Sequence, residues 1–196
     1  MATSTTSGKS GPRPGGRSAR VQAAVHAAVN ALQDEGGRAS LTVPLIAARA
    51  GVTPSTVYRR WGDLADLLAD VAVEHMRPDA EPPDTCSLAG DLHAWSEQYL
   101  DEMTSGVGRA MVRDVLAGTG QPGGQPMPCR CFEFTASQIE AILARARQRG
   151  EADVPTADAL MDAVVAPIIY RLLFAPQPPD VDWLRQRLAQ CVPARV

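Results

Sequence analysis

The side chains of this sequence that are able to bind a metal or act as nucleophiles include four cysteines and three histidines. Cys129 and Cys131 stand one residue apart, but a structural zinc site needs a second pair of ligands at comparable spacing. His26, His75 and His93 share no such spacing with one another or with the cysteines. We therefore expect reduced thiols, no metal and no cofactor.

The sequence also lacks a nucleophile elbow, a P-loop and a dinucleotide-binding fingerprint. Its 196 residues are 45% hydrophobic and 21% charged, which is enough to build the core of one domain or of two small ones. No run approaches the roughly 18 apolar residues that a membrane span needs. These observations predict a globular, cytoplasmic protein that is not an enzyme.

One short stretch at residues 50–61, AGVTPSTVYRRW, instead combines hydroxyls, arginines and aromatic rings. Hydroxyls and arginines bind the phosphates and base edges of nucleic acids. Thr53 is placed to cap a helix that starts at Pro54, where proline is favoured. A preceding helix, capped by Thr42, ends at Gly51, only two residues earlier. Two helices joined by such a turn form a helix-turn-helix.

The charge is distributed unevenly about Trp61, although the net charge is only −3. Residues 1–61 hold eight basic and two acidic side chains, a balance of +6. The rest of the chain has a balance of −9. This asymmetry predicts that the basic third meets a polyanion and that the acidic remainder does not.

Apolar residues recur at helical spacing along most of the chain, and no strand-like alternation of useful length occurs, so the fold class is all-α. Residues 1–16 predict a flexible basic arm. The proline-rich stretch 77–86 predicts the boundary between a helix-turn-helix domain at 17–77 and a second domain at 87–196. Pro167 should kink its helix. The expected helices begin at Arg17, after Thr42, after Thr53 and after Asp63, and then cover about 87–105, 107–118, 129–149, 156–174 and 180–191.

The segment 41–72, LTVPLIAARAGVTPSTVYRRWGDLADLLADVA, resembles the N-terminal domain of the TetR (tetracycline-repressor) family of bacterial regulators. More weakly, RQRGEADVPTADALMDAVVAPIIYRLLFAP, at 147–176, resembles their C-terminal region. The resemblance implies a homodimer, usually of nine helices per chain, that binds double-stranded operator DNA. It also implies that a small molecule in the C-terminal domain releases a palindromic operator. The family often has a phosphate-binding lysine where Leu64 stands here, so that contact is not expected.

The candidate DNA-binding residues gather on the predicted helix-turn-helix and just before it. They are Arg20, Thr42, Thr53, Pro54, Ser55, Thr56, Tyr58, Arg59 and Arg60. The first turn of a recognition helix approaches base edges, so its hydroxyls are expected near DNA unless they are merely solvated. Thr42 either offers its helix terminus to a phosphate or is only a cap. Arg20 could hold the backbone, reach the minor groove or belong to an uninvolved tail.

The rest of the third helix carries two open choices. The resemblance makes Tyr58 a phosphate contact, whereas the alternative is a half-buried core tyrosine. Arg59 and Arg60 lie on adjacent faces, so one is expected to reach the DNA and the sequence leaves open which one. Trp61 is assigned to the core.

In the second domain, aromatic and methionine side chains are candidates for the lining of a ligand pocket, with His93 and Arg113 as possible polar contacts. The pocket candidates are Trp95, Tyr99, Met103, Met111, Phe132 and Phe134. The last two long helices are expected to pair with those of a second copy in a four-helix interface. The dimer candidates are Leu160, Val164, Ile168, Leu172, Leu173, Trp183, Leu184 and Leu188.

The leading interpretation is a ligand-responsive, DNA-binding regulator, most simply a repressor. One alternative on the same scaffold is a redox sensor that uses the thiols of Cys129 and Cys131. A sequence-independent DNA-binding module or an enzyme is the more remote alternative. The expected partners are operator DNA, an unknown small molecule and a second copy of the chain, and no membrane.

Overall fold

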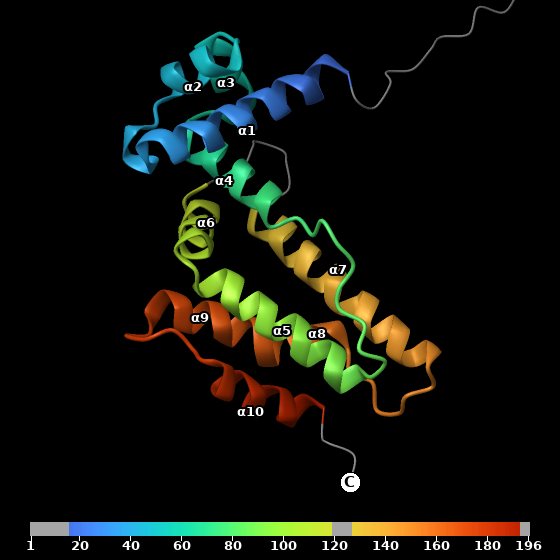
Figure 1. Cartoon of the computed structure of the whole chain (residues 1–196). Coiled ribbons are helices and arrows are strands. Elements are labelled where there is room, and N and C mark those ends of the chain that lie inside the picture. The colour runs from blue at the N-terminus through green and yellow to red at the C-terminus, as the bar shows by residue number, and fades with distance from the viewer. Residues whose placement is uncertain (1–15, 119–126, 193–196) are drawn as a thin grey trace, which may run out of the picture. The chain divides into compact units, whose positions relative to one another are not determined.

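The computed structural model describes residues 16–118 and 127–192, and the chain is drawn in Figure 1. Helices dominate these two ranges and no strand occurs in them, which confirms the all-α class. The chain divides into two compact units, unit 1 at residues 1–64 and unit 2 at residues 65–196. The predicted arm, except for Gly16, and the Gly/Pro-rich stretch 119–126 lie outside the described residues.

Unit 1 contains the predicted helix-turn-helix. Its elements are α1 (Arg17–Gly36), the 3₁₀ turn η1 (Arg38–Ser40), α2 (Val43–Ala50) and α3 (Pro54–Trp61). Helix α1 packs against α2, and α2 packs against α3. The core takes one apolar stripe from each helix, with Val25, Val29, Ile46, Val57 and Trp61 at most 2% exposed. The turn η1 was not predicted, because three residues are too few to show a period.

Unit 2 begins within α4 and holds all of the later helices. Its elements are α4 (Leu64–His75), α5 (Leu88–Thr104), α6 (Gly106–Ala117), α7 (Met127–Gln148), α8 (Ala157–Leu160), the π-helical turn η2 (Met161–Val165), α9 (Ala166–Phe174) and α10 (Val181–Cys191). Because α8, η2 and α9 follow one another without a break, the described residues form nine helices, as the resemblance implied.

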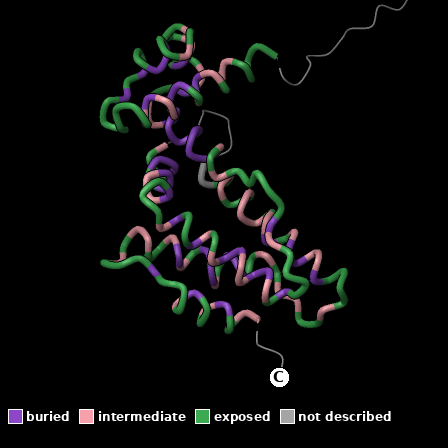
Figure 2. The backbone as a smooth tube through the Cα atoms, in the orientation of Figure 1, coloured by how far each residue is buried: buried purple, intermediate pink, exposed green. Residues whose placement is uncertain are grey.

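The core of unit 2 lies between α5, α7, the α8–α9 helix and α10, and Figure 2 marks buried residues along these helices in purple. The large side chains Leu92, Ile139, Ile142, Leu143, Ile168 and Leu184 are buried there. Helix α10 contacts α5 and η2, and α5 also contacts α7 and α9. No helix in the described ranges is both long enough and apolar enough to cross a lipid bilayer.

Pro167 is accommodated by a local change of helix type. A proline inside an α-helix lacks an N–H donor and presses its ring against the carbonyl four residues earlier. Here five residues, Met161 to Val165, adopt the wider π-helical turn directly before the α-helix that contains Pro167. The prediction of a continuous helix around this proline is confirmed, and the distortion is a π-turn.

The division into compact units falls at residues 64 and 65, so the contacts group α4 with the later helices. The sequence instead predicted a boundary at 77–86, after α4. That proline-rich stretch is the connection between α4 and α5, and it has no helix of its own.

Candidate nucleic-acid interface and ligand cavity

The turn between α2 and α3 is set by Gly51. Its backbone is left-handed, with φ of 68°, a conformation that glycine adopts without the steric cost of a Cβ atom. The N–H of Gly51 donates to Ala48 O at 3.3 Å and the N–H of Val52 donates to Ala47 O at 3.0 Å. These two bonds form a Schellman motif, which ends α2 and lets α3 begin three residues later.

Three hydroxyls gather where α3 starts. Thr53 is the N-cap residue, as predicted, but its side chain accepts no bond from a helix amide. Its Oγ1 lies instead 3.0 Å from Ser55 Oγ and 2.9 Å from Thr56 Oγ1. At the start of α2, Thr42 does cap, accepting the N–H of Leu45 at 3.4 Å.

The two long sides of α3 differ in exposure. Val57 and Trp61 are buried, which confirms the core assignment of Trp61, and the Trp61 ring lies 6.1 Å from that of His26 in α1. Tyr58 is 49% exposed, so about half of its side chain is open to solvent on this side of α3. Ser55 and Arg59 are exposed beside it. One side of α3 therefore anchors the helix, and the other presents hydroxyls and a cation.

The two neighbouring arginines of α3 have different environments. Arg60 reaches back to α1, donating to Ser18 Oγ at 2.6 Å and to Gln22 Oε1 at 2.6 Å. Its guanidinium also lies 5.1 Å from the Trp61 ring centroid. Arg59 is exposed and makes no hydrogen bond or ion pair within the described ranges. Of this pair, Arg59 therefore has the more accessible guanidinium.

The start of α1 adds further exposed cations to unit 1. Arg17 and Arg20 are exposed and border a small hollow of about 390 Å³ between α1 and the end of α2, whose other lining residues include Ala50 and Val52. Arg49 is less available, because Glu35 holds its guanidinium through bonds of 2.8 and 2.6 Å.

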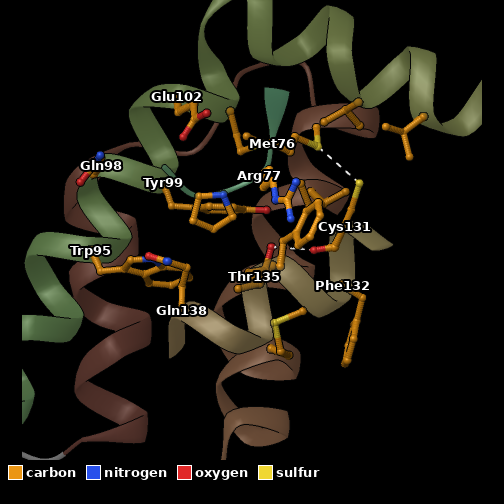
Figure 3. Close-up of a pocket in the computed structure, with 18 of the residues that line it drawn as sticks. Met76, Arg77, Trp95, Gln98, Tyr99, Glu102, Cys131, Phe132, Thr135 and Gln138 are labelled. Atoms are coloured by element: carbon orange, nitrogen blue, oxygen red, sulfur yellow. Dashed lines mark hydrogen bonds between the residues drawn. The ribbon is translucent and has the colours of Figure 1, made fainter. Parts of the chain in front are cut away.

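Unit 2 contains a cavity of about 800 Å³, within the size range of small-molecule sites. Five of the six predicted pocket residues line it, and Figure 3 shows several of them around the space. They are Trp95, Tyr99, Met103, Phe132 and Phe134.

The stacked rings of Trp95 and Tyr99 form one wall of the cavity. They lie one turn apart on α5, with centroids 5.4 Å apart and planes inclined by 19°. Burial raises the pKa of the Tyr99 hydroxyl well above its ordinary value, and a hydrogen bond with Thr135 offsets only part of this. Tyr99 therefore stays protonated at neutral pH, as a neutral polar group in an otherwise aromatic wall.

The structure also places polar residues around the cavity that the sequence reasoning did not select. Gln98 and Glu102 come from α5, and Thr135 and Gln138 come from α7, as Figure 3 shows. Residues 75–83 contribute a further wall, and α9 contributes another through residues such as Tyr170. All four share one sequence signal, a position about one turn after a predicted aromatic residue. Gln98 follows Trp95 and Glu102 follows Tyr99 by three residues. Thr135 follows Phe132 by three residues and Gln138 follows Phe134 by four.

Three expectations for the pocket need correction. Met111 packs with Ala72, Val73 and Val115, and it is absent from the cavity lining. His93 and Arg113 do not line the cavity either. The physical reason is helical geometry: each of these residues lies on a face of α5 or α6 that points elsewhere, which sequence spacing alone does not fix.

The environment of the two candidate redox thiols does not favour the redox alternative. Residues two positions apart on a helix point away from each other, and Cys129 and Cys131 both lie in α7. Cys129 is exposed, whereas Cys131 is partly buried with its Sγ 3.4 Å from Met76 Sδ. Burial raises the pKa of the Cys131 thiol, which disfavours the reactive thiolate.

The predicted dimer residues need a larger correction. Five of the eight lie inside the core of a single chain and are at most 2% exposed: Leu160, Val164, Ile168, Leu184 and Leu188. A side chain buried within its own chain has no surface left to bury against a partner. Leu172, Leu173 and Trp183 are half-buried, and Leu173 also lines the cavity. The apolar stripe of these helices therefore faces their own core.

The exposed sides of the same helices carry other apolar residues. Tyr170 and Phe174 of α9 are 66% and 71% exposed, their ring centroids lie 5.1 Å apart, and both also border the cavity. On α10, Trp183 lies between two cations, 5.1 Å from Arg171 and 5.4 Å from Arg187. Exposed aromatic pairs of this kind are common at protein interfaces.

Helix α4 is tied to α7 by a largely buried ion pair. Asp70 of α4 is 6% exposed, and its Oδ1 lies 2.9 Å from Arg130 Nη1. Arg130 also lies 3.6 Å from Glu74 one turn further along α4. A carboxylate buried to this degree needs its partner, because an unpaired buried charge is costly.

The helix-turn-helix and the helical unit with its cavity define a class of DNA-binding regulatory protein, and the comparisons agree. Residues 25–71 match the model of bacterial regulatory proteins of the tetR family, and residues 82–191 match that of the tetracyclin repressor-like C-terminal domain. The chain belongs to the TetR family of transcriptional regulators.

Relatives and solved structures give the same result. The HTH-type transcriptional regulator Rv1556 of Mycobacterium tuberculosis (strain ATCC 25618 / H37Rv) is 30% identical over 77% of this chain and 75% of its own length. AqdR of Rhodococcus erythropolis is 26% identical over 82% of this chain and 78% of its own. The crystal structure of the TetR family transcription regulator SCO0332 has the same fold, with a TM-score of 0.62 at 23% identity over 87% of this chain and 96% of that one.

Proposed function

We propose that this regulator is a ligand-responsive repressor that binds a palindromic operator as a homodimer and acts in the cytoplasm. The observation that carries the proposal is the division of α3 into a buried side and a side with exposed Ser55, Tyr58 and Arg59. A recognition helix needs this arrangement, because one side must be fixed while the other enters the major groove. The domain that binds DNA is taken as residues 17–77.

On the DNA, Ser55 and Thr56 act near base edges, while Tyr58 and Arg59 bind the backbone or a groove edge. Arg60 has a positioning role, since Ser18 and Gln22 of α1 already hold its guanidinium. Thr42 and Pro54 lie at the two helix starts, where backbone amides favour phosphates. Arg20 at the exposed start of α1 adds affinity through the phosphate backbone.

The effector site is the aromatic cavity of unit 2, whose volume suits a small organic molecule. Binding there favours a conformer of the dimer in which the two recognition helices no longer match half-sites about 34–36 Å apart. Coupling of this kind is typically about 1–3 kcal/mol, which corresponds to roughly 5–150-fold in operator affinity.

We place the dimer contact on the exposed side of α9 and α10, around Tyr170 and Phe174, because the five buried candidates face the core of their own chain. Phe174→Asp should give monomers in sedimentation velocity, because a carboxylate in an apolar interface lacks a partner. Val107→Asp is the matched control, since Val107 is a similarly exposed apolar residue on α6. If Phe174→Asp remains dimeric, the contact lies elsewhere.

A footprint titration on the DNA upstream of the chain's own gene tests the function as a whole. The proposal expects a single protected site with two-fold symmetry at nanomolar protein concentration. It also expects a thermal-shift ligand screen to yield a compound that removes the footprint. Uniform protection along the fragment would support a sequence-independent binding module, and a footprint that only peroxide removes would support the redox sensor.

A further inference from the structure

The connection between α4 and α5 lies along α7 and forms one wall of the cavity. We call residues 78–84, with the sequence PDAEPPD, the wall segment. Six of its residues, 78–83, line the cavity although the segment contains no helix. Three of its seven residues are prolines, which restricts the backbone and removes N–H donors. The segment cannot be held by the regular hydrogen bonds of a helix, so other groups must hold it.

Side chains of α7 supply these bonds. Arg145 donates from Nη1 to Pro82 O at 2.9 Å and from Nη2 to Pro83 O at 2.5 Å. Gln138, two turns earlier on the same helix, donates to Ala80 O at 3.3 Å. One arginine thus holds two consecutive carbonyls with a planar, five-donor group, which a lysine ammonium would not reproduce.

The residue that directly follows the wall segment, Thr85, is held by a buried carboxylate. Asp91 of α5 is fully buried, and its Oδ1 accepts the N–H of Thr85 at 2.6 Å and the Thr85 hydroxyl at 2.9 Å. Its Oδ2 lies 3.1 Å from Arg149 Nη2 and 3.8 Å from Arg145 Nη2. The Nη2 group of Arg145 that donates to Pro83 O therefore also lies beside the buried Asp91 carboxylate, which favours a cation at this place.

We propose that Arg145 is the positioning residue of the cavity: it holds the wall segment against α7, and so sets the size of ligand that the cavity takes and the rate at which the ligand leaves. This inference rests on the proposed role of the cavity as the effector site. It follows from the geometry, because the same residues that accept the bonds of Arg145, Pro82 and Pro83, also line the cavity.

The test compares Arg145→Lys and Arg145→Ala with the wild-type chain, and uses Arg147→Ala as the matched control. Arg147 lies half a turn away on α7, is exposed, and pairs with Glu140 of the same helix. Gln138→Ala removes one weaker bond to the wall and serves as a milder variant should Arg145→Ala fail to fold. Arg145→Lys keeps the positive charge near Asp91 but cannot hold both carbonyls.

The first readout is hydrogen–deuterium exchange of the full chain, which needs neither DNA nor ligand. Amide exchange at Thr85 and Cys86 should accelerate by about tenfold in both Arg145 variants and stay within about twofold in Arg147→Ala. Exchange in the α7 core around Ile142 should stay unchanged. Equal exchange in wild type and Arg145→Lys would overturn the assignment, since charge alone would then suffice.

The second readout uses two uncharged fluorescent probes of different size, N-phenyl-1-naphthylamine and Nile red, in stopped-flow dissociation. Both Arg145 variants should release the smaller probe several-fold faster and bind the larger probe relatively better than wild type does. Gln98→Trp, which places a bulky ring in the cavity, should abolish the signal and so locate it.

The two readouts separate failure of this inference from failure of the proposed function. Faster exchange with unchanged probe kinetics would overturn the role of Arg145 in ligand access. If the wild-type chain binds neither probe, the result contradicts both the proposed effector site and the role of Arg145 in ligand access. Exchange then still decides whether Arg145 holds the wall.

Discussion

In unit 1, Arg59 is exposed with no partner in the described ranges, whereas in unit 2 the arginines Arg130, Arg145 and Arg149 are all held by carboxylates or backbone carbonyls. The same side chain thus has two roles. The exposed Arg59 of unit 1 is open to another molecule, whereas Arg130, Arg145 and Arg149 of unit 2 fasten helices and a loop together, much as Arg49 and Arg60 do within unit 1. The positive balance of residues 1–61 is therefore more informative about partners than the net charge of the whole chain.

The largest change in stability is expected at the buried Asp91 of unit 2. Asp91→Asn should lower the free energy of unfolding at pH 7 by about 2–3 kcal/mol, because charge-assisted bonds from Arg149 and Thr85 are lost or weakened. Urea unfolding measures this. Asp101→Asn, an exposed position on the same helix, should have no comparable effect.

The stability difference between the wild-type chain and Asp91→Asn should depend on pH. Burial would raise the pKa of the Asp91 carboxyl, but the bonds from Thr85 and Arg149 outweigh it and hold the pKa below its ordinary value of 3.8. A carboxyl whose pKa is lowered in the folded state stabilises the fold fully at pH values above its pKa in the unfolded state. This stabilisation is lost as the pH falls through its pKa in the folded state. The difference between wild type and Asp91→Asn should therefore shrink below about pH 3.8. A constant difference between pH 7 and pH 3 would contradict the charged role of Asp91.

A second variant of unit 2 tests the tie between α4 and α7. Arg130→Ala should cost about 2 kcal/mol of unfolding free energy, since it removes a cation 2.9 Å from the mostly buried Asp70 carboxylate. This loss of unfolding free energy is smaller than that expected for a fully buried ion pair, because Arg130 is itself 28% exposed. Arg147→Ala, which removes an exposed pair, should cost less than about 1 kcal/mol. Equal losses would mean that burial of Asp70 does not matter.

The smallest effects are expected at the exposed side of α3 in unit 1. Tyr58→Phe should weaken operator binding by about 1 kcal/mol on all sequences, because it removes one hydroxyl from the backbone contacts. Thr56→Ala should instead alter the preference at particular base pairs. Fluorescence anisotropy with a set of single-base operator variants measures both. If neither variant changes the titration, this side of α3 does not face the DNA.

Local signals in the sequence explain why unit 1 was predictable. Pro54 starts α3, Gly51 and Gly62 end helices, and the period of Val57 and Trp61 identifies the buried side, so each boundary depends on residues close in the chain. The sequence could not show which of Arg59 and Arg60 is held within the chain, because the partners of Arg60 are Ser18 and Gln22, about forty residues away.

Unit 2 was predictable only in part, for a related reason. Aromatic residues on α5 and α7 identified most of the cavity, because large rings at helical spacing must pack around something. An apolar stripe, however, looks the same whether it faces its own core or a partner, so Leu160 and Ile168 were assigned to the wrong surface. The bonds from Arg145 to Pro82 and Pro83 span more than sixty residues and leave no trace in local sequence.

The difference between the exposed Arg59 and the held Arg60 is tested most directly by the salt dependence of operator binding in Arg59→Ala and Arg60→Ala. The account predicts that Arg59→Ala weakens binding by about tenfold and reduces the slope of log affinity against log salt by about one, with unchanged stability. Arg60→Ala should keep the slope and lose stability, because its bonds to α1 disappear. The opposite pattern, an unchanged slope in Arg59→Ala and a reduced slope in Arg60→Ala, would contradict the account.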